Sequence, residues 1–446
     1  MNFEFLEKKY RLLFNNCAYD KPTIISAMPE MGKTVSAINY CAAKQNCFYF
    51  AFANMEADFA LKTFCNNNAE SFANCDDWKL FFERLENLAK EKRLTVFFDN
   101  ASVRNDKSEF YEELSAFLKK NTHTAIIFLC RPWEKIDVEA DEINIDNISL
   151  KEIADFYNVS DKEAANIFLL TSGITSILAE YNIDLSFDDN IKNMLNIKSA
   201  FYNYPIKLMR DCFRSPEAYN TLLYAISNGY NRISEISSFS GQPKNKCDKY
   251  LKTLIEYNLV RKECNKNGYA NYYPANSYFS LWYKFLFTAV PNPSGSFDES
   301  IYKKLTEYFY DFIVPEFYKY LCFNWIKNNF SFWFTIKTDA EIEKLKNIVI
   351  DDITFDFMYN ENGKHHYFYF DTDFNGGINK TLVNHIDKIT TKITPFYDNE
   401  YFYLSVNRIP DSMAKLSQKY DNIHFVRLSV LFTAYKTGEN RNHFKI

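Results

Sequence analysis

The chain has 446 residues, of which 47% are hydrophobic and 24% charged, so it is long enough for roughly two to four domains with apolar cores. Its formal net charge of −5 excludes a global attraction to nucleic acid and leaves only local basic patches for such contacts. No run of about 18 apolar residues occurs, so we expect no membrane-spanning helix and no membrane partner.

The first 149 residues alternate short apolar runs with helical periodicity. The predicted strands are TIIS (23–26), CFYFAFA (47–53), LTVFFDN (94–100), TAIIFLC (124–130) and EINI (142–145). Strands that alternate with helices indicate a parallel sheet with helices on both faces. Burial on both faces also explains the continuous apolar runs VFF and IIFL. The sequence therefore predicts an α/β domain over residues 1–149.

The stretch SAMPEMGKTVSAINY places Gly-Lys-Thr between the first predicted strand and a predicted helix, which is the context of a phosphate-binding loop. Glycine is scarce, with 10 in the chain, which favours this interpretation over an exposed helix start. Gly32 would allow close backbone approach, Lys33 would reach the β- and γ-phosphates, and Thr34 would place its hydroxyl on Mg²⁺. The predicted nucleotide-binding residues are Ala27, Met28, Pro29, Glu30, Met31, Gly32, Lys33, Thr34 and Val35.

The second half of such a site is an acidic residue at the end of an apolar strand. LTVFFDN supplies Asp99, which could hold Mg²⁺ through water or simply cap a turn. Asn100 follows, where a glutamate base would activate water. An amide can hold a water but cannot take its proton, so we expect ATP binding with Mg²⁺ to survive better than hydrolysis. Arg131 could contact a γ-phosphate in cis or from a neighbouring subunit, but a surface or salt-bridge arginine is favoured.

Residues 150–210 are predicted to be helical. Three helices then follow in PEAYNTLLYAISNG, ISEISSFSG and PKNKCDKYLKTLIEYN, and a hairpin turns at Asn267-Gly268. This order predicts a winged helix-turn-helix over residues 211–290. Residues 241–275 carry seven basic and three acidic side chains, a net +4. The candidates for contact with duplex DNA are Lys244, Lys246, Lys249, Lys252, Arg261 and Lys262, together with Lys266. Lysines contact phosphates with little base specificity; the alternative is a solvated face of a module that packs between domains.

PNPSGS (291–296) is the best linker, and a separate α/β domain is predicted after it, over residues 299–446. Two helices are expected around 301–313 and 315–328. The strands expected next are VIDDITFDFMYN (349–360), HHYFYFDTDF (365–374), YFYLSV (401–406) and IHFVRL (423–428), with the helix TLVNHIDKITTKI (381–393) between the second and third.

Taken together, these stretches resemble prokaryotic, archaeal-type P-loop ATPases of the AAA/STAND type. That family carries a winged helix and a C-terminal restriction-endonuclease-like PD-(D/E)xK domain. The family loop resembles YGRRRVGKT, where this chain has SAMPEMGKT. The family's next motif is a strand that ends in Asp-Glu, and the corresponding strand of this chain ends in FFDN. The segments that carry the rest of the resemblance are ISLKEIADFYNVS, SPEAYNTLLYAISNGYNRISEIS, NYYPANSYFSLWYKFLF and VPEFYKYLCFNWI, in which Glu316 holds a family glutamate's place.

The resemblance implies a P-loop NTPase sheet, a helical lid, a winged helix-turn-helix and a C-terminal α/β nuclease-like domain. It also implies ATP and Mg²⁺ as cofactors and nucleotide-dependent self-association. A nuclease of this fold needs Asp on one strand and Glu-x-Lys on the next. Asp356 takes the first position, Asp371 the glutamate's and Asp373 the lysine's, so the cation is missing.

Lys380 or Lys388 on the following helix could replace that cation, but a degenerate site is favoured. His365 and His366 are adjacent on a strand, so they point to opposite faces and make a weak metal pair.

The chain has ten cysteines, which show neither CxxC nor zinc-site spacing, and its N-terminal stretch is amphipathic rather than signal-like. These features predict reduced thiols in a cytoplasmic protein.

The favoured function is an ATP-binding P-loop ATPase with weak hydrolysis, coupled to the winged helix. Two alternatives stay open: a non-enzymatic DNA-binding or scaffold protein with a decayed nucleotide site, and a metal-dependent nuclease.

Overall fold

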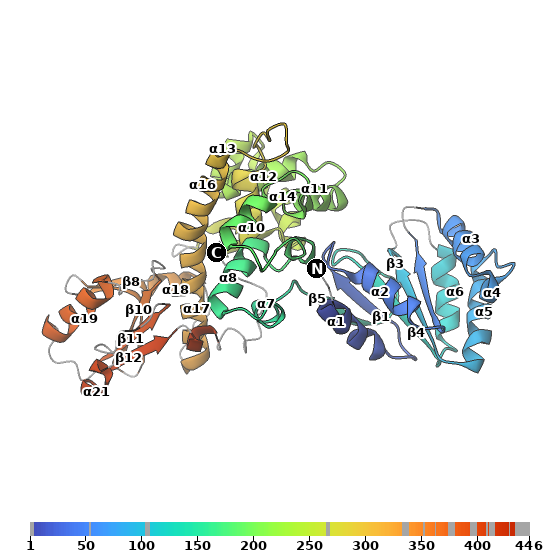
Figure 1. Ribbon diagram of the computed structural model, residues 1–446, viewed down its shortest axis with the longest axis horizontal. Helices are drawn as coiled ribbons and strands as arrows, with labels where there is room; N and C mark the ends of the chain where they lie inside the picture. Colours follow the sequence, from blue (N-terminus) through green and yellow to red (C-terminus); the bar gives the residue numbers. More distant parts are fainter. Residues whose placement is uncertain are drawn as a thin grey trace. The chain divides into compact units, whose positions relative to one another are not determined.

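The chain falls into two compact units in a computed structural model (Figure 1). Unit 1 comprises Met1–Asn147 and Ile174–Ala179, and unit 2 comprises Ile148–Gly173 and Glu180–Ile446. The described residues are 4–52, 55–102, 108–264, 268–331, 339–350, 353–361, 363–372, 380–392, 399–406, 409, 415–427 and 429–432.

Unit 1 is built on a five-stranded parallel sheet. Its strands are β1 (Thr23–Ala27), β2 (Cys47–Ala51), β3 (Leu94–Asp99), β4 (Thr124–Cys130) and β5 (Asp141–Ile145). They lie in the order β2-β3-β4-β1-β5, and every neighbouring pair is parallel. The five predicted strands and their parallel arrangement are thus confirmed. Because the strands are parallel, the carboxyl ends of β1 and β3 lie at one edge of the sheet, separated by β4.

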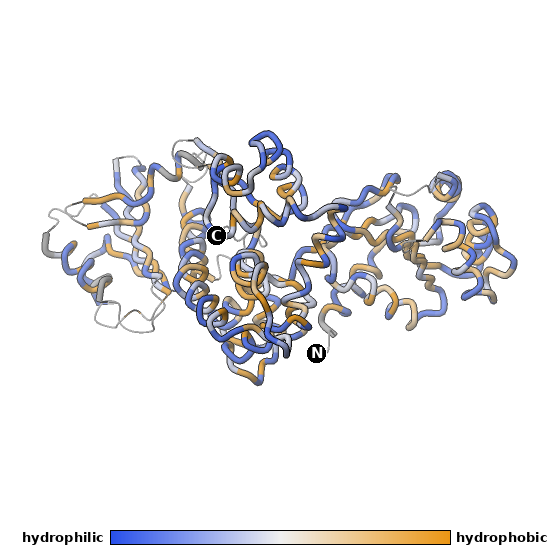
Figure 2. Tube along the Cα trace, turned by 90° about the horizontal axis from the view of Figure 1, so that it is seen from above, coloured by the Kyte–Doolittle hydropathy of each residue, from blue (hydrophilic) through white to orange (hydrophobic). Residues whose placement is uncertain are grey.

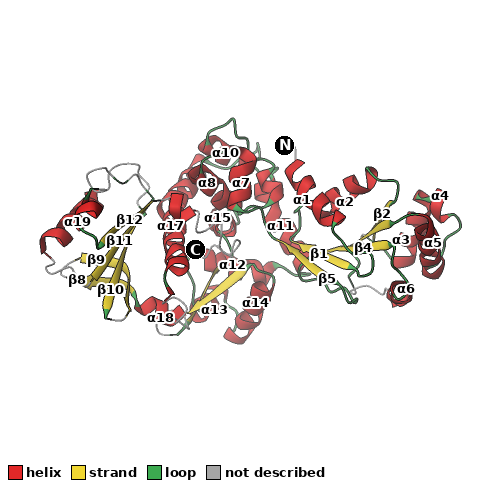
Figure 3. Ribbon diagram, turned by 90° about the horizontal axis from the view of Figure 1, so that it is seen from below, coloured by secondary structure: helices red, strands yellow, loops and turns green. Residues whose placement is uncertain are grey.

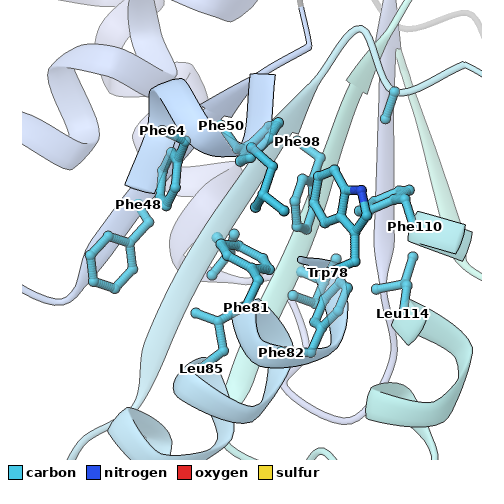
Figure 4. Close-up of a cluster of buried hydrophobic side chains, with 14 of the residues drawn as sticks. Phe48, Phe50, Phe64, Trp78, Phe81, Phe82, Leu85, Phe98, Phe110 and Leu114 are labelled. Carbon is cyan, nitrogen blue, oxygen red and sulfur yellow. The ribbon is translucent and has the colours of Figure 1, made fainter. Parts of the chain in front are cut away.

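Helices accompany this sheet. They are α1 (Glu4–Asn15), α2 (Lys33–Ala42), α3 (Ala57–Asn67), α4 (Ala69–Phe72), α5 (Trp78–Glu91), α6 (Ser108–Leu118) and α9 (Thr175–Leu178). Alternation along β2 sends Phe48 and Phe50 to one face and Tyr49 to the other. Figure 4 shows Phe48 and Phe50 in a cluster with Trp78 and Phe81 of α5. In α5 the buried residues recur at the three- and four-residue spacing of an apolar helix face.

Phe81→Ala should destabilise unit 1 by about 3–5 kcal/mol, because it opens a cavity in this cluster. The ring is fully buried and lies 5.2 Å from that of Phe72 and 6.0 Å from that of Phe50, centroid to centroid. Urea unfolding followed by circular dichroism measures the loss. Phe59→Ala on α3 is the control, since Phe59 is 60% exposed and its removal should cost less than about 1 kcal/mol. Equal losses in both variants would contradict the assigned core.

Unit 2 begins with helices and a hairpin. The elements are α7 (Leu150–Tyr157), α8 (Asp161–Thr171), α10 (Phe187–Met194), α11 (Ala200–Cys212), α12 (Glu217–Ser227), α13 (Ile233–Ser240), α14 (Lys244–Glu256), β6 (Val260–Cys264), β7 (Ala270–Pro274) and α15 (Ser277–Phe285). The predicted order of three helices and an antiparallel hairpin is present in α12–α14 and β6–β7. Gly241 ends α13 in the left-handed conformation, as its position in the sequence suggested.

The rest of unit 2 contains a second five-stranded sheet (Figure 3). Its elements are α16 (Glu299–Tyr308), the π-helix η1 (Phe309–Ile313), α17 (Val314–Asn329), α18 (Asp339–Lys344), β8 (Lys346–Ile350), β9 (Ile353–Glu361), β10 (Lys364–Asp371), α19 (Lys380–Lys392), β11 (Asn399–Ser405), α21 (Leu416–Lys419) and β12 (Ile423–Arg427). The order is β12-β11-β10-β9-β8; the first three strands pair in parallel and the last three antiparallel.

Two expectations for this part were wrong in detail. The single strand expected over residues 349–360 is instead the end of β8 and most of β9, which pair antiparallel at Ile350 and Ile353. Two consecutive aspartates, which are poor strand formers, separate them in the sequence. The two helices expected around Pro315 form one continuous helical segment, in which η1 precedes the proline.

Hydrophilic and hydrophobic residues alternate along the helices of the chain (Figure 2), as amphipathic helices require.

The prediction that all cysteines are reduced was wrong for two of them. Cys41, near the end of α2, and Cys47, at the start of β2, form a disulfide with their Cα atoms 4.8 Å apart. The short connection between α2 and β2 brings the two residues within reach of each other. The other eight cysteines are free, and all except Cys264 are buried.

Candidate functional site

The loop between β1 and α2, called the cradle below, contains two residues with a left-handed backbone. Glu30 has φ 60° and Gly32 has φ 81°, both in the left-handed region. Such residues allow successive N–H groups to converge on one point. The first hydrogen bond at the start of α2 runs from Ser36 N–H to Gly32 O, so the N–H groups just before Ser36 have no acceptor within the helix. A left-handed glutamate costs about 1 kcal/mol or more, and such strain is typical of functional loops.

Met31 anchors this loop to unit 1. Its carbonyl accepts a hydrogen bond from the Tyr10 hydroxyl at 2.9 Å, and Thr175 Oγ1 contacts its Sδ at 3.6 Å. The Met31 side chain is buried. Sequence reasoning found Met31 only by its place in the loop and missed Tyr10 and Thr175, because each lies far away along the chain.

Lys33 is a buried cation at the base of the cradle. The side chain is 9% exposed, and Nζ donates to Ala27 O at 2.5 Å and to Met28 O at 3.1 Å. Burial lowers its pKa to about 8, and the negative charge of Asp99 opposes that shift. A bound phosphate would stabilise this ammonium, because its negative charge would pair with Nζ and raise the pKa of Lys33 toward its usual value.

Asp99 comes together with Thr34, as predicted. Thr34 Oγ1 donates to Asp99 Oδ2 at 2.6 Å, and Asp99 is 4% exposed. A second hydroxyl, that of Tyr49 on β2, donates to the same oxygen at 2.7 Å. Sequence reasoning missed Tyr49. The available signal was its place between two buried phenylalanines, on the face of β2 opposite to theirs.

Two further predicted residues lie at the same edge of the sheet. Asn100 follows β3 in the left-handed conformation, which asparagine tolerates well, and its N–H donates to Leu129 O at 3.2 Å. Arg131 follows β4; its N–H donates to Glu134 Oε2 at 2.8 Å, and its positive charge helps to lower the pKa of Lys33. Arg131 is half-buried, and the surface or salt-bridge role predicted for it stays a prediction.

The predicted DNA-contact residues divide into two groups. Lys244, Lys246 and Lys249 are exposed on α14, and Lys262 is exposed on β6. Lys252 is also exposed but pairs with Asp248 at 2.7 Å.

Arg261 differs from all of them, because its side chain is 15% exposed and pairs with Glu263. Its guanidinium also lies 4.6 Å from the Tyr273 ring centroid, and burial lowers its pKa to about 10. Lys266 lies outside the described residues.

The acidic residues of the C-terminal sheet are engaged in local bonds. Asp356 Oδ2 accepts the Phe370 N–H at 2.7 Å, and the buried Asp371 accepts the Ser405 hydroxyl at 2.5 Å. Burial raises the pKa of Asp356. Asp373 lies outside the described residues.

Of the two candidate replacement cations, Lys388 is exposed on α19, and the side chain of Lys380 is not described. Across the part of the chain that the structure describes, no three histidine, cysteine or acidic side chains are grouped to hold a metal ion. His365 lies beside Asn360, whereas His366 stacks on Phe402, so the two rings have different surroundings.

Among the described residues, no helix is both long and apolar enough to cross a bilayer.

No protein-family model matches the chain. An uncharacterized protein of Methanocaldococcus jannaschii, MJECL04, is 23% identical in an alignment of 298 positions that covers 61% of this chain and 65% of that protein. The chain thus spans just under two thirds of this relative.

Among solved structures, a chain from a study of katanin self-assembly matches with 15% identity and a TM-score of 0.24, over 36% of this chain and 57% of its own length. A chain of Drosophila ORC bound to AT-rich DNA and Cdc6 matches with 10% identity and a TM-score of 0.23, over 63% of this chain and 92% of its own. Protein VC1899 of Vibrio cholerae matches with 10% identity and a TM-score of 0.17, over 93% and 96%. All three TM-scores are below 0.5.

Asp356→Asn should raise the melting temperature at pH 7 by about 1–3 °C, the shift produced by under about 1 kcal/mol. The raised pKa of Asp356 means that the folded state favours the neutral form, so its ionisation above the unfolded pKa reduces stability. Asparagine is neutral and still accepts the Phe370 N–H. The gain should shrink as the pH falls through the raised pKa of Asp356 and vanish below its ordinary value of 3.8, where the carboxyl is protonated in the folded and the unfolded state alike. A lower melting temperature would contradict this interpretation of Asp356, and stabilisation of the parent by Mn²⁺ that the variant loses would instead support a metal site.

Proposed function

We propose that this chain is an ATP-binding P-loop protein of AAA/STAND type with weakened hydrolysis. The observation that carries the proposal is the buried Lys33, held against two loop carbonyls beside the Thr34–Asp99 hydrogen bond. A surface lysine at a helix start would be solvated instead. The cost of burying an ammonium is explained if a polyphosphate occupies the cradle.

The residues fit Mg-ATP by their chemistry. The N–H groups at the start of α2 and the Lys33 ammonium would bind phosphate oxygens. Thr34 and Asp99 would hold Mg²⁺, which keeps several waters and needs few protein ligands. The metal would neutralise charge on the phosphates when bound. Asp99 accepts the Thr34 proton in its hydrogen bond, which leaves a lone pair of that hydroxyl for the metal.

Hydrolysis should be weak for two reasons. Asn100 follows Asp99 where a base would be needed, and its amide cannot accept a proton from water. Glu30 adds a negative charge to the cradle itself, where the resembling family has arginine. Both changes act more on the charge that develops in the transition state than on nucleotide binding.

The test is phosphate release from Mg-ATP together with bound nucleotide, measured for the parent, Lys33→Ala and Asn100→Glu. We expect the parent to bind ATP with slow turnover and Lys33→Ala to lose binding. Asn100→Glu should raise turnover at least about tenfold, because it adds a general base. ATP binding by Lys33→Ala as tight as that of the parent would contradict the proposal.

A second candidate function is contact with duplex DNA through α14. It is favoured by the exposed Lys244, Lys246 and Lys249, on a helix followed by the β6–β7 hairpin. Arg261 is left out of this surface because its side chain is 15% exposed and pairs with Glu263. The nucleotide state would then influence DNA affinity, and nucleotide-dependent self-association belongs to the same proposal.

Lys246→Gln with Lys249→Gln should weaken binding to duplex DNA and reduce the slope of log affinity against log salt by about 2, since two phosphate contacts are lost. Lys303→Gln with Lys304→Gln is the matched control, because these neighbours on α16 are also exposed. Fluorescence anisotropy over a salt series, with and without Mg-ATP, measures both effects. An unchanged slope in the α14 variant, or an equal loss in the control, would argue against this surface.

A further inference from the structure

Tyr49 donates its hydroxyl hydrogen bond to Asp99, a carboxylate at the carboxyl edge of the sheet. It lies on β2, pairs in register with Phe97 of β3, and shares its face with Ala51, the register partner of Asp99. Tyr49 and Asp99 are therefore diagonal neighbours on adjacent strands, a separation that an aromatic side chain spans.

The Tyr49 hydroxyl and the Thr34 hydroxyl converge on one carboxylate oxygen. Both donate to Asp99 Oδ2, at 2.7 Å and 2.6 Å, and neither bonds to Oδ1. Two donors on the same oxygen fix the rotation of the carboxylate about its last bond. Burial and the nearby charge of Asp99 raise the pKa of Tyr49, so its hydroxyl stays protonated and remains a donor.

We propose that Tyr49 is a positioning residue for Mg²⁺, which holds Asp99 so that Oδ1 accepts a metal-bound water. The inference rests on the proposed function and adds to it a residue outside the loop. Ligands of a metal site are commonly held by such outer partners, and their removal weakens metal affinity. Thr34 alone would hold the carboxylate by a single hydrogen bond, about which the group can still rotate, whereas the second donor restricts that rotation.

The experiment measures ATP affinity with a fluorescent, ribose-labelled ATP, first in EDTA and then over a Mg²⁺ titration. Tyr49→Phe keeps the ring and removes the hydroxyl. It should raise the half-saturating Mg²⁺ concentration about fivefold, the effect of one lost hydrogen bond, and leave affinity in EDTA unchanged. Tyr40→Phe is the control, because Tyr40 on α2 also donates a hydroxyl hydrogen bond, to Asn15 Oδ1 at 2.8 Å. That variant should leave both quantities unchanged.

A double-mutant cycle separates positioning from folding. In an Asp99→Asn background the metal-binding carboxylate is absent, so adding Tyr49→Phe should change the Mg²⁺ midpoint less than about twofold. An unchanged midpoint in Tyr49→Phe alone would overturn the inference while leaving the proposed function intact. Equal weakening in EDTA and in Mg²⁺ would show a merely structural hydroxyl and would also overturn it. Failure of the parent to bind the labelled ATP would overturn the proposed function and this inference together.

Discussion

The hydrogen bond between Thr34 and Asp99 joins the two halves of the candidate site. Thr34 belongs to the first turn of α2, and Asp99 ends β3, 65 residues later in the chain. The bond can form because β1 and β3 flank β4 in a parallel sheet, which brings their carboxyl ends to one edge. In open sheets of this kind, ligands bind outside the carboxyl ends of the strands. The site therefore depends on the strand order as much as on the Gly-Lys-Thr sequence.

The charges of the site are arranged at a cost to folding. Lys33 is buried with a pKa lowered to about 8, and Arg131 adds a like charge nearby. Glu30 has a left-handed backbone conformation, which costs free energy for a residue that carries a side chain. The aromatic cluster between β2, β3, α5 and α6 supplies the apolar burial that offsets such local costs. Stability lost at a site and regained in the core is the usual pattern for functional loops.

Much of the fold followed from local patterns. The strands of the first sheet and the three helices with their hairpin were predicted from periodicity and turn residues. What periodicity could not reveal was side-chain contact between distant residues: Tyr49 with Asp99, Tyr10 with Met31, and the pairing of Cys41 with Cys47. Burial of an individual charge was equally hidden, as Arg261 shows. The strand break between β8 and β9 was missed because a run of apolar residues continues on both sides of it.

The most direct test is whether Mg-ATP binding takes up a proton at Lys33. Calorimetry near pH 8, in buffers of different ionisation enthalpy, should show uptake of about half a proton per nucleotide, because the phosphate raises a pKa that burial has lowered to about 8. The affinity should be full below pH 8 and fall as the pH rises above it. Lys33→Arg, which stays charged, should show neither effect. Binding by the parent with no proton uptake and no dependence on pH between 7 and 9 would contradict the account.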